Sequence, residues 1–229
     1  MRVLGIILAR GGSQGVPRKN LKKLNGIPLI KYTIDAALNS NLSEVVVSTE
    51  DEEIASFALL CGCKVPFVRP SDLASDTARS IDVAIHALNT MEEITNTRFD
   101  AIMLLQPTTP FRGSQDINAA LELIAQDEMA SSVISVVDVK AHHPARMKYI
   151  ENGVLIDPDF CEKYENQNRQ ELQPMYIRNG AVYLTKRETI LSSSFKGSKS
   201  LALIMPEERS VNIDTMSDFE LAEWTLTHK

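Results

Sequence analysis

The chain has 229 residues, of which 44% are hydrophobic, and it carries a formal net charge of −6 at pH 7. This length and composition are typical of a globular protein with a full core, so we expect one domain over residues 1–229. Nucleic acids and anionic membranes bind concentrated basic surfaces, so the negative charge argues against nucleic acid and membrane as partners. No apolar run approaches the roughly 20 residues of a spanning helix.

Features of the N-terminus and of the cysteines favour a cytoplasmic protein. The apolar run at residues 3–9 is short for a signal peptide and lacks a cleavage site. The cysteines, Cys61, Cys63 and Cys161, are odd in number and have no disulfide spacing, as expected in a reducing compartment. Cys61 and Cys63 could hold a metal, but without a matching His or Cys pair we interpret them as small buried hydrophobes.

Short apolar runs alternate with segments of helical period through most of the chain. The predicted strands, in chain order, are residues 3–9, 43–50, 64–70, 99–107, 130–139, 180–185 and 200–205. The predicted helices are residues 28–40, 51–62, 80–94, 114–126 and 217–229, the last one capped by Ser217. This alternation predicts an α/β fold with a doubly wound, mostly parallel sheet covered by helices on both faces.

The alternation breaks after Val139. Residues 140–178 are polar and irregular, and they are too many for an ordinary loop. Segments of this length are functional lids, interaction arms or disorder, and the interspersed Tyr, Phe, Met and Ile residues argue against disorder. We therefore expect an arm, residues 140–178, inserted into the single domain.

The first loop, residues 10–20, follows the first predicted strand. Its glycines are Gly11, Gly12 and Gly15, and its cations are Arg10, Arg18 and Lys19. Glycines let backbone N–H groups approach an anion closely, and the cations can bind a triphosphate through charge-assisted hydrogen bonds. In a doubly wound sheet this loop forms one wall of the ligand crevice.

Two familiar phosphate-binding patterns do not fit the first loop. No register supplies the Walker sequence, and the dinucleotide fingerprint G-x-G-x-x-G is absent, although Glu50 ends the second predicted strand where a ribose-binding acid could lie. On its composition alone, the loop can also be a flexible turn with solvated cations.

The first loop is one of six sequence motifs that follow one another along the chain. The motifs are LARGGSQGVPRKNLKKLNGIPLI, VVVSTEDEEIA, RPSDLASDTARSIDV, LLQPTTPFR, RNGAVYL and NIDTMSDF. Together they resemble the acylneuraminate cytidylyltransferases. The family includes CMP-sialic acid synthetase and relatives that act on legionaminic and pseudaminic acids. The resemblance covers nearly the whole chain and implies transfer of CMP from CTP to a nine-carbon 2-keto sugar acid, with release of pyrophosphate. It also implies Mg²⁺ as cofactor, with Mn²⁺ as a substitute.

For the nucleotide, the resemblance implies roles for residues of two loops. Those in the first loop are Arg10 and Lys19 on the phosphates, Asn20 on the ribose, and Gly11, Gly12, Ser13 and Gln14 around the phosphates. Many relatives carry Lys at the position of Gln14, and Arg18 could compensate. Arg69 and Ser80 are the expected readers of cytosine, whose acceptors suit a guanidinium and a hydroxyl. Ser80 could instead cap a helix, and Asp72 and Asp76 are interpreted as cap or turn residues.

For the sugar acid, the resemblance implies Gln106, Arg146, Arg169 and Tyr183. A guanidinium binds a carboxylate bidentately, but arginines in an arm can equally serve solubility or the rim of a dimer. The expected metal ligands are Asp214 and, in place of a second family aspartate, Asn212. One or two carboxylates plus substrate phosphates are enough for Mg²⁺. Arg10, Lys19 and Asp214 are the expected catalytic residues.

The family is commonly dimeric through the arm, so we expect a homodimer in which Arg169 can serve the neighbouring subunit. Three alternatives stay open at this point. The acceptor could be pseudaminic acid; it could be 3-deoxy-manno-octulosonate, whose enzymes usually have a different first loop; or the protein could be a nucleotide-binding regulator without catalysis.

Overall fold

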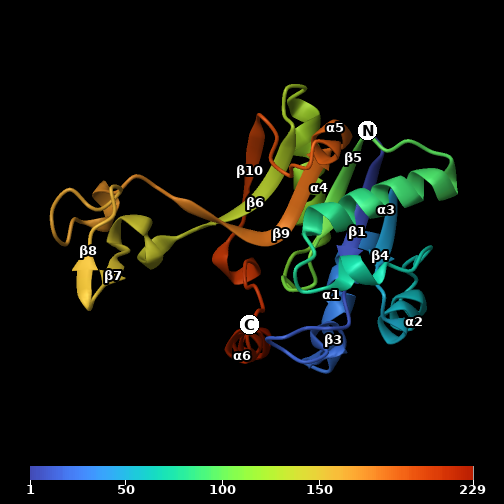
Figure 1. Cartoon of the computed structure of the whole chain (residues 1–229), viewed down its shortest axis with the longest axis horizontal. Helices are drawn as coiled ribbons and strands as arrows, with labels where there is room; N and C mark the ends of the chain where they lie inside the picture. Colours follow the sequence, from blue (N-terminus) through green and yellow to red (C-terminus); the bar gives the residue numbers. More distant parts are fainter. Residues whose placement is uncertain (229) are drawn as a thin grey trace.

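The computed structural model describes residues 1–228 and is built around one mixed sheet (Figure 1). Its strand order is β10-β6-β9-β5-β1-β4. The strands are β1 (Val3–Leu8), β4 (Glu44–Ser48), β5 (Ala101–Leu105), β6 (Ser132–Asp138), β9 (Tyr176–Lys186) and β10 (Ser200–Ile204). β1 is parallel to β4 and β5, and β10 is parallel to β6, whereas β9 runs antiparallel between β5 and β6. The predicted mostly parallel sheet is confirmed, with one antiparallel strand inside it.

Helices cover both faces of this sheet, as predicted. The helices α1 (Leu29–Leu38), α2 (Glu52–Leu60) and α4 (Ser114–Gln126) contribute to one apolar cluster, and α3 (Ser80–Thr95) and α5 (Arg187–Leu191) to another. The buried strands contribute side chains to both clusters. Ile7 belongs to the first and Ile6 to the second, because neighbouring residues of a strand point to opposite faces of the sheet.

A third, smaller cluster lies beside the sheet and joins the two ends of the chain. It contains Val16, Leu24, Leu29, Ile213, Phe219 and Ala222. The short strands β2 (Lys23–Leu24) and β3 (Ile27–Pro28) pair around an Asn25-Gly26 turn, and α6 (Met216–Thr227) packs near β2. The first loop is thereby held against the segment that leads into the last helix.

The arm extends away from the sheet, to the left in Figure 1. Its hairpin consists of β7 (Tyr149–Glu151) and β8 (Val154–Ile156), joined by Asn152 and Gly153 at positive φ. Short 3-10 helices lie at Lys140–His142, Pro144–Arg146 and Arg169–Glu171. β9 already begins at Tyr176, so the last three residues of the predicted arm pair with β6.

Three local predictions were wrong. Residues 64–70 form no strand: Lys64 makes a single bridge to Val46, and Pro66 and Pro70 have no N–H for a ladder. The last helix is capped by Thr215 rather than Ser217, in a reciprocal capping box with Asp218. Ser80 is the first residue of α3 and makes no cap, since Arg79 occupies the cap position. Within residues 1–228, no helix is both long and apolar enough to span a bilayer.

Candidate active site

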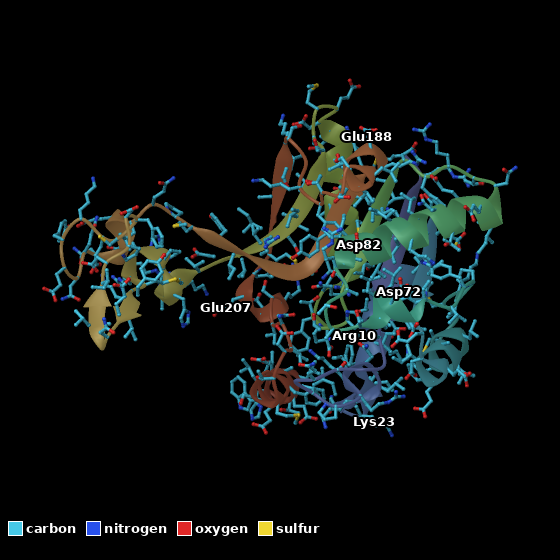
Figure 2. All side chains as sticks on the ribbon, in the orientation of Figure 1. Arg10, Lys23, Asp72, Asp82, Glu188 and Glu207 are labelled. Carbon is cyan, nitrogen blue, oxygen red and sulfur yellow. The ribbon has the colours of Figure 1, made fainter. Side chains whose placement is uncertain are left out.

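A pocket of about 530 Å³ lies where the carboxyl ends of β1, β4 and β5 meet, at the lower edge of the sheet near the labelled Arg10 (Figure 2). We call it the edge pocket. It is lined by the first loop, by residues 69–80 (the base loop), by residues 106–108 and by the metal segment, residues 212–214. The predicted site residues that line it are Arg10, Ser13, Gln14, Lys19, Asn20, Arg69, Ser80, Gln106, Asn212 and Asp214.

The first loop and the metal segment contact each other directly. The buried Lys19 Nζ donates to the Ile213 carbonyl at 2.7 Å and lies 3.5 Å from Asp214 Oδ1. Gly15 touches the same segment: a Cβ at this position would lie 2.0 Å from the Asp214 carbonyl oxygen, so only glycine fits. The ammonium of Lys19 and the carboxylate of Asp214 are therefore held side by side, although 195 positions separate them in the chain.

The first loop is also tied to the base loop, across the edge pocket. Arg10 forms an ion pair with Asp76 at 2.7 Å and donates to the Ser75 carbonyl, and the Gln14 amide donates to Asp76 as well. Asn20 joins the two ends of the first loop, because its Nδ2 donates a 2.9 Å hydrogen bond to the Arg10 carbonyl. Asp76 therefore does more than shape a turn, because it pairs with Arg10, a cation that lines the edge pocket.

Gly11 and Gly12 do not line the edge pocket. The Gly11 N–H donates to Glu50 Oε1 at 2.7 Å, and a Cβ on Gly11 would lie 2.3 Å from Asp51 Oδ2. Arg18 pairs with Asp51 and Glu53, and its hydrogen bond to Asp51 holds the pKa of that carboxyl below its ordinary value. Arg18 thus points to the start of α2 and does not compensate for Gln14.

Arg69 is buried in the wall of the edge pocket. Its Nε donates to Ser48 Oγ at 3.1 Å, another guanidinium N–H donates to the Ser48 carbonyl, and its backbone N–H donates to the Thr49 carbonyl. Burial lowers its pKa to about 10, and the charge of Glu50 opposes that shift. At neutral pH the guanidinium remains charged.

Two residues that support Gln106 were not assigned from the sequence. The fully buried Arg112 donates to the carbonyls of Gln106 (3.3 Å) and Ala181 (2.9 Å), and burial lowers its pKa to about 10. Gly180 has a φ of +79°, and a Cβ there would lie 2.9 Å from Gln106 Oε1. Arg112 ends the motif LLQPTTPFR and Gly180 lies in RNGAVYL. Both residues could therefore have been singled out from the motifs that contain them.

The metal segment offers one carboxylate. The Asn212 amide donates to Asp214 Oδ2 at 2.6 Å, and the Asp214 side chain is 66% exposed toward the pocket. Among residues 1–228 there is no group of three or more His, Cys, Asp or Glu residues arranged to hold a metal. This donor set fits a divalent cation such as Mg²⁺, which proteins commonly bind through one or two carboxylates, with substrate phosphates supplying further ligands.

Three predicted sugar-site residues lie outside the edge pocket. Arg146 is in the arm, where it donates to the Gln167 carbonyl, and Arg169 lines a groove of about 610 Å³ at the base of the arm. Tyr183 lies in β9 with its ring 5.8 Å from the ring of Phe195. The groove reaches Val211 and so adjoins the metal segment.

Known proteins share both the sequence and the fold. The chain is 37% identical over its whole length to CMP-N,N'-diacetyllegionaminic acid synthase of Legionella pneumophila, of which it covers 96%. It is 35% identical over 96% of its length to N-acylneuraminate cytidylyltransferase of Streptococcus agalactiae serotype V, and spans about half of that relative. A solved CMP:2-keto-3-deoxy-manno-octonic acid synthetase complexed with CTP has a TM-score of 0.73 at 15% identity, with 99% of each chain covered.

The model of the family described as cytidylyltransferase matches residues 4–193, which include the first loop, the base loop and Gln106. The matched part also contains β1, β4 and β5, whose carboxyl ends form the edge pocket. The chain belongs to the cytidylyltransferase family.

Proposed function

We propose that this protein transfers CMP from CTP to the anomeric hydroxyl of a nine-carbon 2-keto sugar acid and releases pyrophosphate. One observation carries the proposal: a loop rich in glycine and cations, a buried guanidinium, an amide at the end of β5 and a carboxylate all face one pocket. Nucleotidyl transfer needs little covalent help from a protein. It needs the two substrates in line and compensation of the charge that develops on the phosphates.

The first and base loops bind CTP in this proposal. Arg10 and Lys19 hold the phosphates and remain as fixed positive charges beside the leaving pyrophosphate. Arg10 exchanges its ion pair with Asp76 for the triphosphate when CTP enters. Asn20, which already orients the Arg10 carbonyl, lies at the ribose, and Arg69 and Ser80 read the acceptors of cytosine.

Gln106 and the metal segment serve the reacting centre. Gln106 orients the sugar acid, and the buried Arg112 and the close approach of Gly180 fix its position. Asp214, with Asn212, would hold a divalent cation, which we propose to be Mg²⁺ with Mn²⁺ as a substitute. When bound, such an ion supplies Lewis-acid stabilisation of charge on the phosphate and acceptor oxygens.

The acceptor that we propose is of the N-acetylneuraminic or legionaminic type. The full-length similarity to a diacetyllegionaminic acid synthase and the similarity to N-acylneuraminate cytidylyltransferases support this choice. The likeness to the octulosonate enzyme is a likeness of fold only, at 15% identity. We place the reaction in the cytoplasm, in keeping with the free thiols of Cys61, Cys63 and Cys161.

We further propose that the arm forms a homodimer. Large apolar side chains are exposed along it: Tyr149 (59%), Ile150 (73%), Val154 (58%), Leu155 (68%) and Phe160 (55%). A hairpin exposed in this way gains stability from a partner surface. Neither Arg146 nor Arg169 lines the edge pocket of its own chain, and in the proposed dimer they approach the edge pocket of the neighbouring subunit.

Incubation with CTP, Mg²⁺ and each member of a panel of sugar acids tests the function. We expect pyrophosphate release with N-acetylneuraminic or legionaminic acid, and competition between the acids ranks them. CTP binding without release for any acid, including pseudaminic acid and 3-deoxy-manno-octulosonate, would favour a non-catalytic nucleotide-binding protein.

A further inference from the structure

The corner at the end of β4, residues 48–51, touches both loops that form the edge pocket. Ser48 and Thr49 bind the guanidinium and backbone of Arg69, on the base side. Glu50 and Asp51 contact the first loop, on the phosphate side. The sequence STED at this corner belongs to a motif to which the proposed reaction assigns no role.

Glu50 has an unusual environment within this corner. One carboxylate oxygen, Oε1, accepts the Gly11 N–H at 2.7 Å, whereas Oε2 is buried and has no hydrogen-bond partner among residues 1–228. A buried carboxylate oxygen without a partner is costly, so a nearby positive charge is expected to stabilise it. The buried Arg69, which donates hydrogen bonds to the preceding residues Ser48 and Thr49, carries a charge that interacts favourably with that of Glu50.

The dependence is mutual, because Arg69 has no acidic hydrogen-bond partner among the described residues. Its guanidinium donates to the hydroxyl and the carbonyl of Ser48, which are neutral. Glu50 therefore provides counter-charge to a cation that is only 4% exposed. Glu50 itself does not line the edge pocket, so it cannot bind the ribose directly.

We infer that Glu50 is a positioning residue for the nucleotide, acting on the phosphates through the Gly11 amide and on the base through the charge of Arg69. The inference rests on the proposed use of CTP. With Gly11 fixed, the following residues Ser13 and Gln14 face the pocket. With Arg69 charged and fixed, cytosine is preferred over uracil, because uracil presents an N–H donor at N3 where cytosine presents an acceptor.

The two routes predict different results for two substitutions. Glu50→Gln retains an oxygen for the Gly11 N–H but removes the charge beside Arg69, so we expect CTP to bind about tenfold more weakly. The preference for CTP over UTP should fall by a similar factor, while pyrophosphate binds as in the wild type. Glu50→Ala releases Gly11 too, so pyrophosphate binding should also weaken.

Calorimetric titration of the full-length protein with CTP, UTP and pyrophosphate separates these outcomes. Glu52→Gln is the matched control, because Glu52 is exposed in the first turn of α2. Should Glu50→Gln not fold, Ser48→Ala tests the same route, since it removes an anchor of Arg69 and should lower the CTP preference.

Unchanged CTP affinity and CTP preference in folded Glu50→Gln would overturn the inference, even if its melting temperature fell. The titrations need no sugar acid. A wild-type protein that binds CTP but releases no pyrophosphate would therefore refute the proposed reaction without affecting this comparison.

Discussion

The edge pocket and the arm differ in which kinds of side chain are buried and which are exposed. Around the edge pocket, polar side chains are buried and held by partners from distant parts of the chain, such as Lys19 by Ile213 and Arg69 by Ser48. In the arm, apolar side chains are exposed, and the hairpin β7–β8 pairs only with itself. Several polar side chains at the edge pocket are thus buried, whereas apolar side chains of the arm are left exposed.

This difference indicates which region is complete within one chain. The edge pocket has the loops, the buried guanidinium and the carboxylate that nucleotide binding needs, already positioned by the sheet. None of the three apolar clusters among the described residues includes a residue of the arm, and a two-stranded hairpin is only marginally stable without further packing. Substitutions in the edge pocket should therefore reduce turnover, whereas substitutions in the arm should weaken the proposed dimer.

The largest effect is expected at Asp214. Asp214→Ala removes the one carboxylate of the metal segment, so turnover should fall roughly 100- to 1000-fold. The melting temperature should stay the same, because this side chain is exposed and Ile213 and Thr215 keep their own contacts. Pyrophosphate release across a Mg²⁺ titration measures the change.

Asn212→Asp is the matched variant for that experiment. It places a second carboxylate beside Asp214, so we expect turnover to persist and half-maximal activity to need less Mg²⁺. Turnover by folded Asp214→Ala within a few-fold of the wild type, at every Mg²⁺ concentration, would refute the assignment.

The next largest effect is expected in the arm. Ile150 and Leu155 are paired across the hairpin and are exposed, so replacing both with Ser should leave the monomer folded. If the arm is the dimer interface, these side chains are anchors, and the dimer should dissociate at least about 100-fold more readily. Sedimentation velocity over a concentration series measures this shift.

Leu60→Ser, on α2 of the sheet domain, is the control, because Leu60 is 85% exposed and far from the arm in sequence. A wild-type chain that sediments as a monomer at micromolar concentrations, or a double variant that remains fully dimeric, would contradict the proposed interface.

Lys19 should show an intermediate effect. Lys19→Met keeps the aliphatic stem but removes the ammonium, so we expect about a 10- to 30-fold higher KM for CTP. Lys23→Met is the control, since Lys23 is exposed in β2, outside the pocket lining (Figure 2). An unchanged KM for CTP in folded Lys19→Met would show that the lysine serves only to join the first loop to Ile213.

The periodic parts of the chain were predictable because hydrophobic period reports burial. Val3–Leu8 and Ser114–Gln126 are examples in which local pattern and tertiary environment agree. The direction of β9 was not predictable, since most of residues 179–186 are buried and a strand covered on both faces is a continuous apolar run whichever way it runs. The hairpin at Asn152-Gly153 was missed, although an Asn-Gly pair flanked by apolar residues is a strong hairpin signal.

For the edge pocket, the sequence indicated which motifs to combine but not their contacts. Arg10 and Lys19 could be selected as cations beside glycines. Their partners, Asp76 and Ile213, depend on loops that meet only in three dimensions. Glu50 was noticed as a strand-end acid, but the role inferred for it depends on the hydrogen bond from Gly11 and on the charge of Arg69, which come from two other loops.

The smallest predicted effect compares two ion pairs, one between helices on the sheet and one in the arm. Arg187 binds Glu92 bidentately at 2.9 Å, and this bond holds the pKa of Glu92 below its ordinary value. The pair should therefore stabilise the fold at pH values above about 4.5, and this contribution should be lost as the pH falls through the lowered pKa. Glu92→Gln should reduce the free energy of unfolding by about 1–2 kcal/mol at pH 7. The difference from the wild type should shrink below pH 4. In the arm, Lys148 pairs with Asp157, whose side chain is 63% exposed, so Asp157→Asn should leave the denaturation midpoint nearly unchanged. Urea denaturation of both variants at pH 7 and pH 3.5 makes the comparison, and a larger loss for Asp157→Asn than for Glu92→Gln would show that the arm is stabilised within the single chain.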